Sequence, residues 1–167
     1  TMKSSVCVLT VATVSHTAQS VATLRSARRT GTYASYHLFA VDATAETVAY
    51  LTRKFDPETS WIHVFGPDDL GPERRTFLDA FDRYNPVELS CLAKYVGVSH
   101  VLRGAEAGDV CIFVDSDMLF INDIHVALDA LSDSAVLLTP HLLGPSTDNI
   151  EHDIMVHGWM NAGFLAF

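Results

Sequence analysis

Two carboxylates separated by one residue, Asp115 and Asp117, follow directly on the apolar run Val110–Val114. A run that is apolar at every position is typical of a strand buried on both faces of a sheet. In an extended conformation residues i and i+2 point to the same side, so both carboxylates would address one cation or its bound phosphate. Hard oxygen ligands suit Mg²⁺ or Mn²⁺. The pattern predicts a divalent-metal site, although Asp-x-Asp also occurs in ordinary turns that end strands.

Other polar residues near predicted strand ends are less specific. Asp42 would accept hydrogen bonds from a ligand, or cap the helix that starts near Ala45. His141, His152 and His157 follow the aspartate pair, but their spacing matches no standard metal cluster. Of the three, only His141 is expected at the ligand-binding edge of the sheet.

The chain alternates short apolar runs with longer segments of helical spacing, and this alternation is typical of an α/β fold. Strands are predicted at Val6–Val14, Tyr36–Val41, Trp61–Phe65, Val110–Val114 and Ala135–Leu138, with a final strand at Gly163–Phe167. Helices are predicted at Thr17–Arg29, Ala45–Phe55, Glu73–Tyr84 and from Asn85-Pro86 to about Leu102.

The start of the last of these helices is the best marked. Asn85 is suited to the cap position, Pro86 to the first turn, and Glu88 completes a capping box. Its sheet-facing residues are predicted to be Cys91, Leu92, Tyr95, Val98 and Leu102. We expect a single domain over residues 1–167, with a mostly parallel, Rossmann-like sheet and helices on both faces. In such sheets ligands bind beyond the carboxyl ends of the strands.

Several segments, taken together, resemble glycosyltransferases of the GT-A fold, in particular the glycogenin and bacterial galactosyltransferase type. Val110–Asp117 is similar to the Asp-x-Asp signature of that family, and Leu89–Leu102 to the helix that carries a donor-contacting basic residue. Ala135–His141 resembles the strand after the motif, and His157–Phe164 the segment that contacts the donor sugar. The order of these segments is more specific than any one of them.

The resemblance implies a transferase that binds a nucleotide-diphospho-sugar through Mn²⁺ or Mg²⁺, with a UDP-sugar as the preferred donor and a hydroxyl acceptor. Asp115 would contact the ribose and the metal, Asp117 would chelate the metal, and Lys94 would offer its charge to the diphosphate or the sugar. The other expected donor-binding residues are Ser116 in the motif, Thr10, Ala12 and Thr13 at the first strand, and Asn161, Ala162 and Gly163. No catalytic nucleophile or base is assigned.

Three alternatives stay open. A haloacid-dehalogenase-type phosphatase also uses an apolar strand followed by Asp-x-Asp, but normally on its first strand. A nucleotidyltransferase would carry a Gly-rich, basic loop after the first strand, whereas this chain has Val14-Ser15-His16-Thr17. The chain ends soon after the Asn-Ala-Gly segment, where the family continues into its acceptor site, so we expect a truncated chain. A nucleotide-sugar-binding module without turnover is therefore the third alternative.

The net charge and the cysteines indicate which binding partners and which cellular compartment to expect. The net charge of −9 argues against a nucleic-acid partner, because phosphate backbones are bound by clustered Lys and Arg. No apolar stretch approaches the ~20 residues that cross a bilayer. Cys7, Cys91 and Cys111 form no CxxC pair, and two of them lie in apolar runs as expected of buried thiols. The sequence thus predicts a soluble, cytoplasmic protein.

Overall fold

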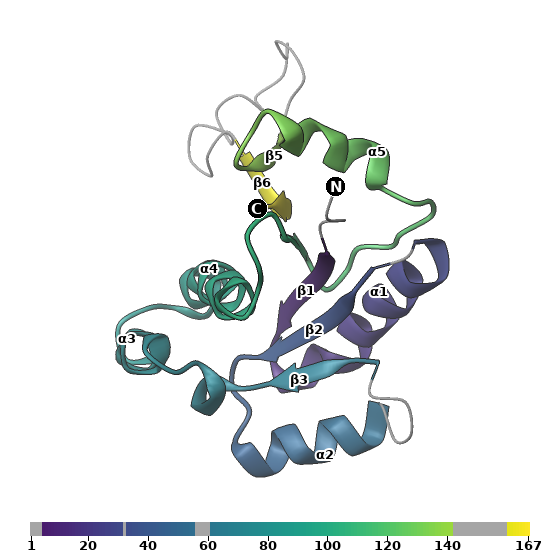
Figure 1. Ribbon diagram of the computed structural model, residues 1–167. Helices are drawn as coiled ribbons and strands as arrows, with labels where there is room; N and C mark the ends of the chain where they lie inside the picture. The colour runs from purple at the N-terminus through teal and green to yellow at the C-terminus, as the bar shows by residue number, and fades with distance from the viewer. Residues whose placement is uncertain (1–4, 32, 56–60, 142–159) are drawn as a thin grey trace, which may run out of the picture.

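The apolar runs form one mixed sheet of six strands in the order β3-β2-β1-β4-β6-β5 (Figure 1). The computed structural model describes residues 5–31, 33–55, 61–141 and 160–167. β1 pairs in parallel with β2 and β4, and β2 in parallel with β3, whereas β6 runs antiparallel to both β4 and β5. The strands are β1 (Val6–Ala12), β2 (Ser35–Ala40), β3 (His63–Phe65), β4 (Val110–Val114), β5 (Leu137–Pro140) and β6 (Met160–Ala166).

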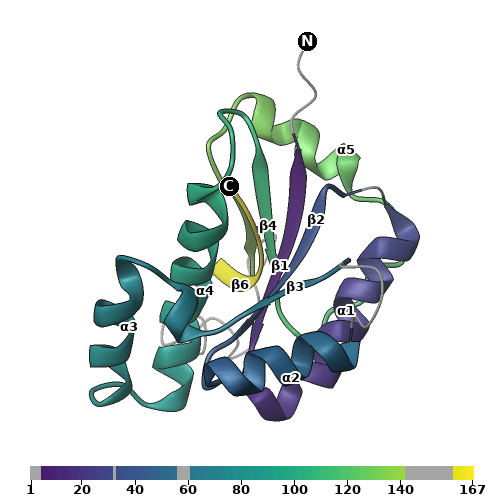
Figure 2. The same ribbon diagram turned by 60° about the horizontal axis from the view of Figure 1, so that its bottom comes forward.

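Helices cover both faces of the sheet, as Figure 2 shows for α1 and α2 against α3 and α4. Buried side chains of α3 and α4 form one core with the odd-numbered residues of β1, including Cys7 and Leu9. Buried side chains of α1 and α5 form a second core on the opposite face, around Val8 and Ile112. The helices are α1 (Thr17–Thr30), α2 (Ala45–Phe55), α3 (Glu73–Phe81), α4 (Pro86–Arg103) and the short α5 (His125–Leu128).

The predicted α/β fold class is confirmed, and the predicted strands and longer helices are present with small shifts of their ends. β1 ends at Ala12, and the short 3₁₀ helix η1 (Val14–His16) occupies what was predicted as the end of that strand. β5 lies two residues later than predicted, and α5 was not predicted. β6 begins at Met160 rather than Gly163, so the Asn-Ala-Gly segment belongs to the strand itself.

The predicted capping box at α4 is confirmed, and the predicted sheet-facing side of this helix is confirmed at Leu92, Val98 and Leu102 but wrong at Cys91 and Tyr95. The Asn85 side chain accepts a bond from the Glu88 N–H (3.1 Å), and the Glu88 carboxylate accepts one from the Asn85 N–H (3.0 Å). Cys91 and Tyr95, however, are exposed. The helix also buries its small residues: Ala93 is fully buried, and a Cβ added at Gly97 would lie 3.1 Å from Leu9 Cδ2.

This packing explains the glycine inside α4. Gly97 lets the helix axis approach β1 and β2 more closely than a side chain would allow. The close approach matters for the site, because it fixes where the neighbouring Lys94 reaches the sheet. Within the described residues no helix is long and apolar enough to cross a membrane.

Candidate functional site

The carboxyl ends of β1 and β4 meet the start of β6 at one edge of the sheet. The Asp115 N–H, one residue after β4, donates to the Gly163 carbonyl in β6 (2.8 Å). Beside this junction is a hollow of about 320 Å³ between β1, α4 and the aspartate motif. Its lining residues are Val11, Ala12, Thr13, His16, Val41, Ser90, Lys94, Asp115 and Ser116.

Lys94 joins the three segments that meet at this hollow. Its Nζ lies 2.8 Å from Asp115 Oδ1 and donates to the Ala162 carbonyl at 3.1 Å. It also lies 5.1 Å from the centre of the Phe113 ring, within the range of a cation–π contact. The Lys94 side chain is only 13% exposed, against 37% for Asp115. A largely buried ammonium therefore stands at the rim of the hollow, neutralised by the first aspartate of the motif.

The aspartate motif is a turn, so the extended conformation assumed from the sequence is wrong. The Met118 N–H donates to the Asp115 carbonyl at 3.2 Å, which closes a four-residue β-turn around Ser116 and Asp117. The buried hydroxyl of Thr23 in α1 holds this turn: it contacts the Ser116 carbonyl at 2.7 Å and the Met118 carbonyl at 2.8 Å. Asp117 is exposed at the tip of the turn.

The carboxylate oxygens at this edge are of the chemical type that binds a hard divalent cation. Mg²⁺ is usually bound by one or two carboxylates, and it takes its remaining ligands from water and substrate phosphates. Asp117 is open to solvent, and Asp115 offers Oδ2 beside its paired Oδ1. Within the described residues no group of three or more His, Cys, Asp or Glu side chains converges to hold a metal. The two carboxylates are ligands of the kind that Mg²⁺ takes together with a substrate phosphate.

The Asn-Ala-Gly segment approaches the motif through backbone and side chain together. Asn161 is exposed, and its Oδ1 accepts a bond from the Gly163 N–H at 2.7 Å. A Cβ added at Gly163 would lie 2.8 Å from this Oδ1 and 3.2 Å from Asp115 Oδ2. Ala162 supplies its carbonyl to Lys94. Glycine at position 163 is therefore what allows β6 to lie against the Asp115 carboxylate.

The three residues predicted at the end of β1 do not all line the hollow. Ala12 and Thr13 line the hollow. Thr10 is fully buried in the sheet, and its hydroxyl has no hydrogen-bond partner among the described residues. Of the two roles considered for Asp42, capping of α2 is wrong: Asp42 accepts a bond from the Val14 N–H (2.7 Å), and the side chain of Thr44 caps α2.

His16 lines the hollow and was not predicted from the sequence. Its Nδ1 is hydrogen-bonded to the hydroxyls of Thr13 (2.9 Å) and Ser15 (3.0 Å). The available signal was its position just after the first strand, where ligand contacts concentrate. Of the histidines considered, His141 is exposed directly after β5, whereas His152 and His157 lie outside the described residues.

Comparison with solved structures identifies the fold as that of GT-A glycosyltransferases. The galactosyltransferase LgtC, in complex with donor and acceptor sugar analogs, superposes with a TM-score of 0.60 at 16% identity, over 96% of this chain and 57% of that one. Mouse xyloside xylosyltransferase 1 gives a TM-score of 0.56 at 10% identity, over 98% and 66%. The glycosyltransferase GlyE of Streptococcus pneumoniae TIGR4 gives 0.53 at 14%, over 99% and 34%.

These likenesses establish the fold, and this chain spans less than two thirds of the length of each of these structures. No known protein-family profile matches the chain. No curated protein is similar to it in sequence either.

Proposed function

We propose that this chain binds a nucleotide-diphospho-sugar and belongs to an enzyme that transfers the sugar to a hydroxyl acceptor. The observation that carries the proposal is the convergence of Lys94, Asp115 and the Ala162 carbonyl at the rim of the hollow. A cation, a carboxylate and a close backbone approach at the carboxyl edge of a sheet suit a phosphorylated ligand. The shared fold with the glycosyltransferases compared above supports a nucleotide-sugar as the donor.

Within this proposal each residue of the site has a specific role. Asp117 and Asp115 would hold Mn²⁺ or Mg²⁺, which when bound neutralises the charge of the diphosphate. Lys94 would add a fixed positive charge beside the departing diphosphate, where a buried, pre-oriented cation acts most strongly. Ala12, Thr13 and Ser116 would border the nucleotide, and Asn161, Ala162 and Gly163 the sugar. Thr10, being buried, would act by packing rather than by contact.

The remaining assignments are also proposals. UDP is the preferred nucleotide, and residues 1–167 are taken as one domain. The three free thiols of Cys7, Cys91 and Cys111 favour a reducing compartment, for which we propose the cytoplasm. Binding without turnover is the second candidate.

Calorimetric titration of UDP, with and without Mn²⁺, tests the proposal. We expect Mn²⁺-dependent binding that Asp117→Asn abolishes, because that substitution removes the exposed carboxylate charge. Asp133→Asn is the matched control, since Asp133 is an exposed aspartate that does not line the hollow. Binding that survives Asp117→Asn, or that falls equally with Asp133→Asn, would refute the assigned site.

Hydrolysis of an aryl phosphate, or release of pyrophosphate from a nucleoside triphosphate, would instead favour the phosphatase or the nucleotidyltransferase.

A further inference from the structure

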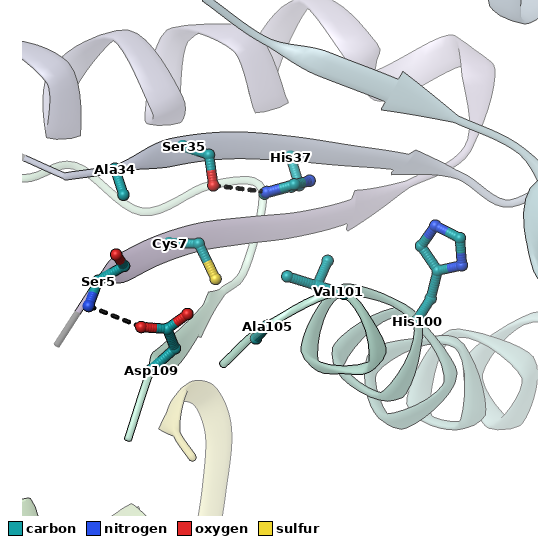
Figure 3. Close-up of a pocket in the computed structure, with 10 residues that line it drawn as sticks. Ser5, Cys7, Ala34, Ser35, His37, His100, Val101, Ala105 and Asp109 are labelled. Atoms are coloured by element: carbon teal, nitrogen blue, oxygen red, sulfur yellow. Dashed lines mark hydrogen bonds between the residues drawn. The ribbon is translucent and has the colours of Figure 1, made fainter. Parts of the chain in front are cut away.

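A second hollow of about 320 Å³ lies at the opposite edge of the sheet, at the amino ends of β1 and β2 and beside the end of α4. Polar groups line much of it, among them Ser5, Ser35, His37 and Asp109 (Figure 3). Its volume leaves room for a small molecule. The proposed nucleotide function uses none of these residues.

Cys7 lines this hollow, and a second thiol lies directly behind it. Figure 3 shows the Cys7 sulfur pointing from β1 toward Val101 and Ala105. In the parallel register Cys7 is paired with Cys111 of β4. Both side chains belong to the same core cluster, on the face covered by α4. Cys7 is 8% exposed and Cys111 is fully buried, so only the first meets a molecule entering the hollow.

The separation of the two residues suits a disulfide. Neighbouring strands lie about 4.8 Å apart, which falls within the Cα separation of roughly 4.4–6.8 Å that disulfides tolerate. The Cys7 thiol donates a hydrogen bond to the carbonyl of Val110, the residue before Cys111, at 3.3 Å.

We propose that Cys7 is a site of reversible oxidation by small peroxides, with Cys111 as its resolving thiol. The Cys7 thiolate attacks one oxygen of the peroxide, an S–O bond forms, and the O–O bond breaks. Cys7 becomes a sulfenic acid, and the second oxygen leaves as water or an alcohol after taking up a proton. The Cys111 sulfur then attacks the Cys7 sulfur, the S–S bond replaces the S–O bond, and the hydroxide leaves with the Cys111 proton as water.

The surroundings of the two thiols indicate which of them reacts first with the peroxide. The hydrogen bond from Cys111 lowers the pKa of Cys7, although burial and the negative charge of Asp109 oppose this. The same contact, together with burial, raises the pKa of Cys111. Reactivity toward peroxide follows thiolate character and access, and both favour Cys7. Neither carboxylate oxygen of Asp109 is free to approach Cys7 as a base, because they accept bonds from Ser5 and Glu106.

The test uses the Cys91→Ser protein, because Cys91 is exposed on α4 and would form bonds between chains. This protein is treated with hydrogen peroxide, and its remaining thiols are alkylated after unfolding. We expect loss of both thiols, a mass lower by two hydrogens, a Cys7–Cys111 cross-linked peptide, and full recovery with dithiothreitol. Persistence of both thiols under conditions that oxidise Cys91 in the unsubstituted protein would overturn the proposal. Oxidation of Cys7 without the cross-link would overturn the resolving role.

Two further variants in the same background fix the order of attack. With Cys111→Ala, Cys7 should accumulate as a sulfenic acid that dimedone traps. With Cys7→Ala, Cys111 should stay reduced; dimedone labelling of Cys111 instead would reverse the assignment. The peptide mapping of the Cys91→Ser protein needs no core substitution, so it decides the question even if these variants do not fold.

Discussion

Single substitutions of Lys94 and of Asp115 should lower the free energy of unfolding by different amounts. The lysine side chain is 13% exposed and the aspartate 37%. Asp115→Ala leaves a largely buried ammonium with the Ala162 carbonyl and the Phe113 ring as its described partners. Lys94→Met leaves a carboxylate that water can reach, and the methionine fills most of the volume of the lysine stem.

The magnitudes lie between two measured limits. Breaking a fully buried pair costs about 3–5 kcal/mol, and breaking an exposed one costs about 0.2–1 kcal/mol. Since Asp115 is more than a third exposed, we expect about 2 kcal/mol for Asp115→Ala, below the buried limit. For Lys94→Met we expect about 1 kcal/mol, near the exposed limit. The double variant leaves no stranded ammonium, so it should cost about 2 kcal/mol rather than the sum, a coupling of roughly 1 kcal/mol.

Urea denaturation of the four proteins at pH 7, without nucleotide or metal, measures these differences. The slopes of the unfolding free energy against urea should stay equal, so that the midpoints report stability alone. A larger loss for Lys94→Met than for Asp115→Ala would contradict the burial argument. A coupling below about 0.3 kcal/mol would show that the pair acts as two independent surface charges.

Three further predictions follow from the core and the turn. Gly97→Ala should destabilise the chain by about 1 kcal/mol in urea, because crowding against buried Leu9 outweighs the better helix propensity, whereas Gly104→Ala, whose added Cβ has only a carbonyl nearby at 3.8 Å, should not. Burial, with the charges of two neighbouring histidines, lowers the pKa of His37 to about 4, below its unfolded value of about 6.5. The unfolded state therefore takes up the proton first, and up to roughly 3 kcal/mol of stability present above pH 6.5 is lost toward pH 4, a loss that His37→Gln should reduce in thermal scans. Thr23→Val should cost about 1 kcal/mol in urea and weaken Mn²⁺-dependent UDP binding, because the aspartate turn loses the single hydroxyl proton of Thr23 that the Ser116 and Met118 carbonyls share.

Features encoded within a few residues were predictable from the sequence. The capping box of Asn85 and Glu88 depends only on the local chain, and it forms as predicted. The run Val110–Val114 becomes a buried strand because an apolar segment between two covered faces has one stable arrangement. The position of Asp115 at its exposed end follows directly.

Features that depend on packing between distant segments were not predictable in the same way. The hydrophobic pattern of α4 pointed correctly to Leu92, Val98 and Leu102, but Cys91 and Tyr95 are exposed. The close approach of Gly97 to Leu9 and Phe39 depends on strands that lie far from it in the sequence. The turn at Asp115 depends on Thr23, which is distant in sequence. The contact between Lys94 and the Ala162 carbonyl needs the antiparallel direction of β6, which the sequence pattern does not specify.

The pairing of Lys94 with Asp115 gives the two aspartates of the motif different parts in the proposed site. Asp115 is engaged by the lysine in the free chain, whereas Asp117 is exposed at the tip of the turn. A cation would thus bind Asp117 first, and it would share the Asp115 carboxylate with the Lys94 ammonium. Asp117→Ala should then remove metal dependence with a stability change within about 0.5 kcal/mol, while Asp115→Ala should reduce both properties. Stability and metal binding should therefore rank the two substitutions differently, as expected where Asp115 pairs with Lys94 and Asp117 is exposed.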